Sequence, residues 1–234
     1  ISIEDLITPQ DMVVTLTHTG YMKATPAEEY RAQNRGGRGK QAAATKEDDF
    51  IDNLFVANTH DYILCFSSRG RVYWLKVYEL PQGGRTSRGK PIINLLPLEA
   101  DEKINAILPV KEFTDDQFVF MATVDGTVKK TPLSDFSNPR KAGIIAVALD
   151  EGDYLIGAEI TSGTQDIVLV SDAGKAVWFD EEDVRPMGRT ARGVRGMKLG
   201  EGQQVLSLLV AANHQETVLI ATENGFGKRT VLAD

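Results

Sequence analysis

The feature that most constrains the fold is a pattern that returns five times along the chain. Each copy is an apolar run that ends in Ser or Thr three positions before a glycine. The glycines, separated by 50, 56, 48 and 51 residues, are Gly20, Gly70, Gly126, Gly174 and Gly225. A fixed period of this length is typical of proteins built from repeated structural units.

Each copy of the pattern indicates β structure. Runs rich in Val, Ile, Phe and Tyr end at turns such as Asp125-Gly126 and Asn224-Gly225, and glycine supplies the positive φ that tight hairpin turns need. Two further apolar runs complete a unit of about four short strands, which cannot bury both faces of its own sheet. We therefore predict an all-β, propeller-like β-pinwheel of four-stranded blades that cover one another.

We expect at least four to five such blades, of about 50 residues each, in a single domain over residues 1–234. The approximate repeats are 13–62, 63–118, 119–166, 167–217 and an incomplete 218–234.

Charge is segregated by position within the repeat. The chain carries a net charge of −7, yet four windows, 31–46, 81–98, 137–149 and 184–200, contain no acid and hold 15 of its 26 basic residues. A glycine recurs at equivalent places in these windows, as Gly39, Gly89, Gly143 and Gly193. An acid recurs nine positions after the hairpin glycine, as Glu29, Glu79, Asp135 and Asp183.

Equivalent positions of blades around an axis lie at equivalent places, so the four windows predict a basic belt on one rim. Guanidinium groups match phosphate geometry, and glycine lets backbone N–H groups approach a ligand closely. The windows contain no aromatic residues, which disfavours single-stranded binding by base stacking. We therefore predict contact with the backbone of double-stranded DNA, with little sequence preference. A solvated loop is the usual explanation of an isolated charge run, but four runs in register favour the belt.

Candidate catalytic and metal-binding patterns are weak. Residues 84–90 match the GxxxxGK pattern of a phosphate-binding P-loop, but Pro91 stands where Ser or Thr is required, and residues 92–96 read as strand rather than helix. The chain's histidines, His18, His60 and His214, lack metal-ligand spacing. We expect no catalytic residue, no metal site and no cofactor in this chain.

The single cysteine, Cys65, lies in an apolar run, so we expect a buried thiol and no disulfide within the chain. This favours a reducing, cytoplasmic setting. No apolar run approaches the roughly 18 residues of a membrane-spanning helix, so we expect no membrane partner.

Residues 33–40, Gln-Asn-Arg-Gly-Gly-Arg-Gly-Lys, closely resemble the gyrase box. This motif marks the C-terminal domain in the A subunit of bacterial DNA gyrase, which is a type IIA topoisomerase. The resemblance continues through IEDLITPQDMVVTLTHTGY, RGKPIINLLPLE and ATENGFGKRT and covers essentially the whole chain. Asn34 departs from the box, where a second Arg is usual.

The resemblance implies a non-catalytic domain that wraps and bends duplex DNA with right-handed, positive writhe and so enables ATP-dependent negative supercoiling. Its implied partners are the N-terminal cleavage core of the gyrase A subunit, and the gyrase B subunit, in an A2B2 heterotetramer of the bacterial cytoplasm. ATP and Mg belong to that holoenzyme. The implied wrapping contacts are Arg35, Arg38 and Lys40, with Gln33, Gly36, Gly37 and Gly39 shaping the loop. The other contacts expected on the rim are Arg85, Arg88, Lys90, Arg140, Lys141, Arg189, Arg192 and Arg195.

Two alternatives remain open. The corresponding C-terminal domain of topoisomerase IV shares the blade repeat but usually lacks an intact box. A repeat scaffold that binds acidic proteins would also carry a basic rim, and competition between duplex DNA and a peptide ligand would separate it from a DNA-binding domain.

Overall fold

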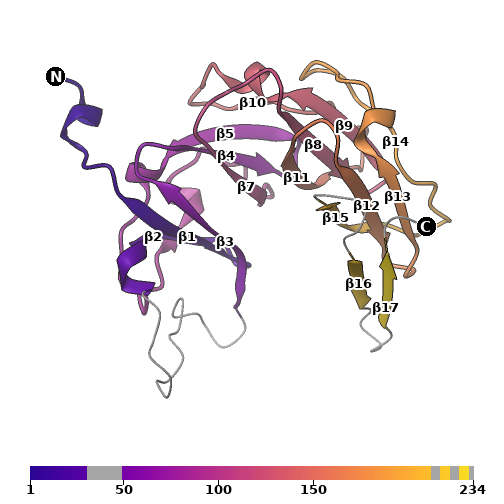
Figure 1. Cartoon of the computed structure of the whole chain (residues 1–234), viewed down its shortest axis with the longest axis horizontal. Helices are drawn as coiled ribbons and strands as arrows, with labels where there is room; N and C mark the ends of the chain where they lie inside the picture. Colours follow the sequence, from indigo (N-terminus) through magenta and orange to yellow (C-terminus); the bar gives the residue numbers. More distant parts are fainter. Residues whose placement is uncertain (31–48, 212–216, 222–226, 232–234) are drawn as a thin grey trace. The chain divides into compact units, whose positions relative to one another are not determined.

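The computed structural model describes residues 1–30, 49–211, 217–221 and 227–231 (Figure 1). The chain forms two compact units. One comprises Ile1–Cys65, Tyr73–Lys111 and Arg140–Ala142, and the other comprises Phe66–Val72, Glu112–Pro139 and Gly143–Asp234.

Each described sheet contains an antiparallel hairpin, as the repeated turns predict. The described hairpins are β1 (Asp11–Thr17) with β2 (Tyr21–Pro26), β4 (Tyr62–Ser67) with β5 (Arg71–Lys76), β8 (Phe118–Thr123) with β9 (Thr127–Pro132), β12 (Asp166–Ser171) with β13 (Ala176–Asp180), and β16 (Thr217–Ala221) with β17 (Gly227–Val231). The first strand of each of the first four hairpins is almost entirely buried. Such a strand is covered on both of its faces, as in stacked blades.

A third strand lies later in the same repeat and pairs with the first strand of the hairpin. These strands are β3 (Ile51–Asn58), β7 (Ile104–Val110), β11 (Leu155–Thr161) and β15 (Val205–Ala211). Each pairing with β3, β11 and β15 has a register shift near one end, which increases the local twist of a sheet.

A fourth, two-residue strand arrives from a connector later in the chain. The sheet orders are β3-β1-β2-β6, β10-β5-β4-β7 and β11-β8-β9-β14, where the new strands are β6 (Lys90–Pro91), β10 (Ile144–Ile145) and β14 (Val194–Arg195). Three sheets therefore have four strands, which confirms the predicted all-β, bladed architecture. Each of them combines strands from three successive stretches of sequence.

The hairpin glycines recur for two physical reasons. Gly20, Gly70, Gly126 and Gly174 all have positive φ, between 74° and 94°, a conformation that other residues rarely adopt. The carbonyl of Gly20 also accepts from the N–H of Ile92 at 2.8 Å. At Gly126 a Cβ atom would lie 2.6 Å from the carbonyl oxygen of Met197, so a side chain there would displace the connector.

Each compact unit has its own apolar core. The core of the first unit contains Met12, Val14 and Met22, and it also holds Cys65, which is completely buried. This burial confirms the prediction of a core cysteine. It also raises the pKa of the Cys65 thiol to about 12. The core of the second unit is built around Phe120 and Ile167.

The acids at the ninth position after the first four hairpin glycines lie in short 3₁₀ helices. The four helices are η2 (Ala27–Tyr30), η3 (Val77–Glu79), η5 (Leu133–Phe136) and η6 (Glu181–Asp183). Each begins directly after the second strand of a hairpin. At η3 the Glu79 carboxylate accepts from the N–H of Lys76 at 3.0 Å, which stabilises the start of the helix.

A different acid stabilises the first hairpin turn. Asp49 accepts hydrogen bonds from the backbone N–H groups of Thr19 and Phe50 and from the Thr19 hydroxyl. Burial alone would raise the pKa of Asp49, but these bonds and one from the Thr17 side chain lower it to about 2.

The residues after Pro91 differ from the sequence-based expectation. Ile92–Asn94 form a 3₁₀ helix, η4, where we expected a strand. The N–H groups of Leu95 and Leu96 donate back to the carbonyl of Ile92, so the chain turns away from the sheet edge. Within the described residues, no helix has the length and apolar character needed to cross a membrane.

Candidate nucleic-acid interface

The predicted contact residues fall into two groups. Those of the box, residues 33 and 35–40, lie outside the described part of the chain. The others are described: Lys90, Arg140, Lys141, Arg192 and Arg195 are exposed or nearly so, whereas Arg85, Arg88 and Arg189 are half-buried.

In the first unit, the connector that carries Arg85, Arg88 and Lys90 runs along β2. Ala24 forms a parallel bridge with Gln82, and the Thr25 hydroxyl donates to the carbonyl of Gly83 at 2.7 Å. A tight turn follows, in which the N–H of Ser87 donates to the carbonyl of Gly84 at 3.0 Å. The connector is therefore bonded to the sheet before its first arginine.

A buried lysine lies beneath this turn. The side chain of Lys23, on β2, is 1% exposed, and its Nζ donates to the carbonyls of Gly84, Arg85 and Ser87 at 2.8, 2.9 and 2.7 Å. All three ammonium donors therefore have acceptors. Burial lowers the pKa of Lys23, and the negative charge of Glu29 opposes that shift.

The rest of this connector packs closely on the hairpin. The Arg88 guanidinium lies 3.7 Å from the centroid of the Tyr21 ring, a cation–π contact. Gly89 has a φ of +83°, and a Cβ atom there would lie 2.5 Å from the carbonyl oxygen of Met22. Glycine is thus required at this position by the connector's own packing, in addition to any approach by a ligand.

The second unit repeats this arrangement on β9. The N–H of Met187 donates to the carbonyl of Lys130 at 2.7 Å, and the N–H of Ala191 closes a turn onto the carbonyl of Gly188 at 3.2 Å. The Nζ of the fully buried Lys129 donates to three carbonyls, at 2.6, 2.6 and 3.0 Å. These acceptors belong to Ala146, Arg189 and Ala191.

Opposing effects act on the pKa of Lys129. Burial and, to a lesser extent, the nearby Arg189 guanidinium lower its pKa to about 8, while Asp135 opposes that shift. Near neutral pH the group is mostly an ammonium ion, which matches its three donated hydrogen bonds.

The end of this connector also resembles that of the first. Gly193 has a φ of +98°, and a Cβ atom there would collide with the carbonyl oxygen of Val128. Arg195 then pairs with Thr127 in the short strand β14. One difference is that Arg192, the equivalent of Arg88, forms an exposed ion pair with Asp150 at 2.8 Å.

The connector that carries Arg140 and Lys141 is held differently. Gly143 again has positive φ, +73°, and its carbonyl accepts from Nη2 of Arg71 at 3.1 Å. The position of the buried lysine is taken by Tyr73, whose hydroxyl bonds to the buried Glu102 carboxylate at 3.0 Å. This connector therefore lacks the feature that we call the lysine clamp, a buried lysine whose Nζ donates to three backbone carbonyls.

Several of the predicted cations are available for a ligand. Among the described residues, Arg85, Arg189 and Arg195 form no ion pair. Each lies in a window without acids. Such guanidinium groups suit bidentate contacts with phosphate.

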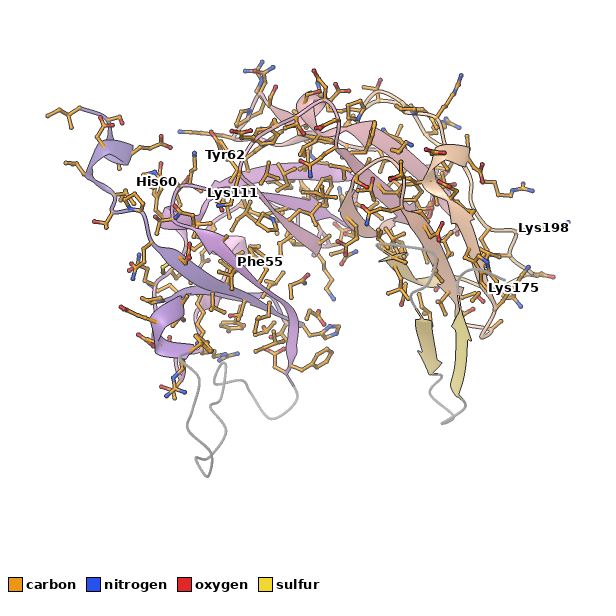
Figure 2. The ribbon with its side chains drawn as sticks, in the orientation of Figure 1. Phe55, His60, Tyr62, Lys111, Lys175 and Lys198 are labelled. Carbon is orange, nitrogen blue, oxygen red and sulfur yellow. The ribbon has the colours of Figure 1, made fainter. Side chains whose placement is uncertain are left out.

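Lysines outside the four windows have other roles (Figure 2). Lys111 forms an ion pair with Asp61 at 3.4 Å. Lys175 donates to the backbone carbonyl of Lys198 at 3.3 Å, and Figure 2 shows the two residues side by side. In the part of the chain that the structure describes, no three His, Cys, Asp or Glu residues are grouped as metal ligands would be.

The buried lysines beneath the turns, Lys23 and Lys129, were not among the residues predicted from the sequence. The sequence contained two signals for these buried lysines. Lys23 and Lys129 both stand three positions after a hairpin glycine, and the turns above them share the pattern Gly-Arg-Thr-Ser/Ala-Arg-Gly at residues 84–89 and 188–193. Lysine in an apolar strand is rare unless its charge is satisfied.

A protein-family model matches most of the chain. A family model described as "DNA gyrase C-terminal domain, beta-propeller" matches residues 11–58, 61–111, 117–162, 165–212 and 216–234. The DNA gyrase A subunit of Klebsiella oxytoca is 60% identical over 234 residues, and that of Escherichia coli K12 is 58% identical over the same length. These matches cover all of this chain, which spans 27% of the length of either relative.

Solved structures with the same fold include domains from two topoisomerases. The C-terminal domain of a DNA topoisomerase IV matches with a TM-score of 0.81 at 31% identity, over 97% of this chain and 69% of that one. A DNA gyrase A C-terminal domain matches with a TM-score of 0.70 at 32% identity, over 94% of this chain and 71% of that one.

Proposed function

The chain belongs to the DNA gyrase C-terminal domain family, and on that premise we propose that it is the part of a gyrase A subunit that binds and wraps duplex DNA. The observation that carries the proposal is the pair of equivalent connectors, each bonded to its own sheet and each presenting arginines in a window without acids. The domain itself performs no chemistry, and its contribution is to bend DNA for a cleavage reaction elsewhere.

The charge pattern supports contact with the DNA backbone rather than with bases. In a propeller, equivalent positions of successive blades share one rim, so a duplex held by one connector can continue to the next. Arginine contacts to phosphate fix position and carry no sequence information, which favours binding with little sequence preference.

The energetic cost of bending requires several connectors to act together. Wrapping about 40 base pairs through a half-turn costs about 10 kcal/mol for an elastic duplex. A hydrogen bond to a charged group contributes about 1.5–3 kcal/mol, so on the order of five such contacts must form together. A single window holds between two and five cations, whereas the four windows together contain 15.

The wider assembly follows from the same premise. We propose that the domain acts beside the cleavage core of its own polypeptide, together with the gyrase B subunit, in an A2B2 heterotetramer of the bacterial cytoplasm. ATP and Mg act in that assembly, outside this chain. A right-handed wrap would supply the positive writhe that strand passage converts into negative supercoils.

Ligation of nicked circular DNA tests the proposal. The circles are sealed with increasing amounts of the chain, the protein is removed, and the linking-number distribution is read on a gel. The proposal expects a positive shift proportional to bound protein. Binding in a gel-retardation assay without any shift would contradict wrapping, and no binding at all would contradict the DNA-binding function.

The comparisons favour gyrase over topoisomerase IV as the parent enzyme. A gyrase A subunit is 60% identical over the whole chain, and the sequence retains Gly36-Gly37-Arg38-Gly39-Lys40 of the box. The solved gyrase and topoisomerase IV domains match at nearly equal identity, 32% and 31%, and do not separate the two enzymes. No feature of the described residues specifically favours a scaffold for acidic proteins, and competition by duplex against an acidic peptide distinguishes that function.

A further inference from the structure

Two turns in the connectors share a sequence and a mode of attachment. Residues 84–89 read Gly-Arg-Thr-Ser-Arg-Gly and residues 188–193 read Gly-Arg-Thr-Ala-Arg-Gly. In the first, Lys23 Nζ bonds to the carbonyls of Arg85 and Ser87. In the second, Lys129 Nζ bonds to the carbonyls of Arg189 and Ala191. The lysine thus binds the same two carbonyls in both turns.

This attachment fixes the direction of two peptide planes in each turn. The described chain contains no cis peptide bond, and in a trans peptide the N–H points opposite to the preceding C=O. The carbonyls of Arg85 and Ser87 point to the buried ammonium, so the N–H groups of Thr86 and Arg88 point away from it. The N–H groups of Thr190 and Arg192 are oriented in the same way over Lys129.

These outward N–H groups are left without partners in the part of the chain that the structure describes. There, the backbone N–H groups of Thr86, Arg88, Thr190 and Arg192 donate no hydrogen bond. By contrast, the intervening N–H of Ser87 or Ala191 is used to close its turn. Backbone N–H groups in a turn conformation can form an anion-binding nest, and two unbonded N–H groups of each turn face away from the lysine.

The surroundings add positive charge to each turn. A buried ammonium lies beneath it, and each turn carries two arginines, of which Arg88 packs on the Tyr21 ring. The acids that act on the lysines are Glu29 and Asp135, and Asp150 pairs with the exposed Arg192. One phosphate on the outer side would therefore meet two backbone donors and at least one guanidinium, that of Arg85 or Arg189.

We propose that residues 84–89 and 188–193 are two phosphate-binding nests. In the first, the backbone N–H groups of Thr86 and Arg88 hold one DNA phosphate, and in the second those of Thr190 and Arg192 hold another. Lys23 and Lys129 are the positioning residues that orient these peptides. The inference rests on the proposed function and deepens it, because it assigns the contact to main-chain atoms as well as to arginine side chains.

Residues 84–90 match the GxxxxGK pattern, but their structure differs from that of a P-loop. A P-loop places its donors at the start of a helix, whereas here Lys90 begins a two-residue strand that is followed by a three-residue 3₁₀ helix. The site suits a single phosphate of a larger backbone.

Backbone NMR of the ¹⁵N-labelled chain tests the nests directly. The probes are two 20-base-pair duplexes of unrelated sequence and, separately, inorganic phosphate. We expect downfield shifts of the N–H protons of Thr86, Arg88, Thr190 and Arg192 with either duplex. The N–H protons of Ser87 and Ala191, already bonded within their turns, are the internal control and should move much less.

A neutral variant separates the nests from general basic charge. In Lys129→Met, the shifts of Thr190 and Arg192 should disappear while those of Thr86 and Arg88 persist, because Lys23 is unchanged. Duplex affinity should fall about tenfold, the loss expected for one hydrogen bond to a charged group. Lys111→Met, which removes an exposed lysine outside the windows, should leave affinity and all four shifts nearly unchanged.

The outcomes distinguish the nests from the proposed function. Duplex binding without selective movement of the four N–H protons in the unsubstituted chain would overturn the nests and leave DNA binding intact, and this readout does not depend on the variant folding. Equal losses for Lys129→Met and Lys111→Met would also overturn them. Failure of either duplex to bind would overturn both proposals, even if inorganic phosphate alone moved the four protons.

Discussion

At the scale of single residues, the chain places ionisable groups where folding alters their protonation. Lys129 is fully buried, and its pKa is lowered to about 8, against an ordinary value near 10.4. Asp49 has a pKa lowered to about 2 because hydrogen bonds favour its charged form. Both groups therefore couple stability to pH, in ways that can be separated by variants.

The first prediction concerns Lys129 at alkaline pH. Between about pH 8 and 10.5 the folded chain releases the Lys129 proton while the unfolded chain keeps it, so the free energy of unfolding rises with pH across this window. Lys129→Met lacks this contribution. Urea titrations at pH 7, 8, 9 and 10 should show the stability of the unsubstituted chain increasing relative to the variant. If the difference in the free energy of unfolding between the unsubstituted chain and Lys129→Met stays constant from pH 7 to 10, the bonded carbonyls hold the pKa of Lys129 near its ordinary value.

The second prediction concerns Asp49 at acid pH. Its folded pKa is depressed, so its contribution is fully present above about pH 4 and is lost as the pH falls through about 2. Asp49→Asn should lower the free energy of unfolding by about 2 kcal/mol at pH 7. The difference from the unsubstituted chain should shrink between pH 4 and pH 2. Asp52→Asn, which removes an exposed partner of His18, is the control and should cost much less.

At the scale of elements, each four-stranded sheet depends on a connector that returns to an earlier hairpin. The two-residue strands β6, β10 and β14 bring the connectors to β2, β5 and β9. A glycine with positive φ directly precedes each short strand, as Gly89, Gly143 and Gly193. These glycines couple the basic loops to the sheets.

The third prediction tests that coupling at Gly193. An Ala there would adopt φ near +98° and push its Cβ into the carbonyl of Val128, a strain of about 1–3 kcal/mol. Gly193→Ala should lower both the free energy of unfolding and duplex affinity. Gly188→Ala is the matched control in the same connector, because a Cβ there meets nothing within 4 Å. Equal effects of the two substitutions in urea titrations and gel retardation would contradict the role assigned to Gly193.

The elements also show what the sequence could and could not predict. The hairpins followed from local signals, since Gly20 and Gly126 mark turns that depend on nearby residues alone. The pairing of short strands such as β14 could not be predicted, because two residues carry no periodicity and their partners lie about 67 positions away in the chain. Lys23 and Lys129 did leave a signal in the sequence, their shared position three residues after a hairpin glycine. Their role was missed because Lys129 finds its acceptors at Arg189 and Ala191 only after the chain has folded.

At the scale of the whole molecule, acidic and basic residues have separate tasks. Outside the four windows, 170 positions carry 33 acidic and 11 basic residues, a surplus that repels polyanions. Inside the windows the charge is entirely positive. On the proposed function, we expect duplex DNA to bind along the connectors, where the charge is positive.

The fourth prediction follows from this separation. Binding through several phosphates releases condensed counterions, so duplex affinity should fall about a thousandfold or more between 50 and 200 mM salt if six or more phosphates are contacted. A filter-binding titration at four salt concentrations measures the slope. A slope near zero would show that the windows do not act as a phosphate-binding surface.

The fifth prediction concerns the box, whose residues 33–40 lie outside the described part of the chain. The glycine-rich, acid-free sequence of the box predicts a loop, and exposed loop charges contribute little to folding. Replacing Arg35, Arg38 and Lys40 by Ala should therefore leave the melting temperature nearly unchanged. The same triple variant should lose the positive linking-number shift in the nicked-circle assay, because wrapping needs contacts along the whole bent duplex.

A charge-matched triple variant outside the windows, Lys103→Ala, Lys111→Ala and Lys175→Ala, is the control, because it removes the same net charge from the molecule. If wrapping depends on cations at particular repeat positions, this control should retain most of the linking-number shift. If it depends only on overall charge, the two triple variants should lose it equally. A large drop in melting temperature for the box variant alone would instead assign the box to folding, and the wrapping contacts would then have to come from the arginines of the other three windows.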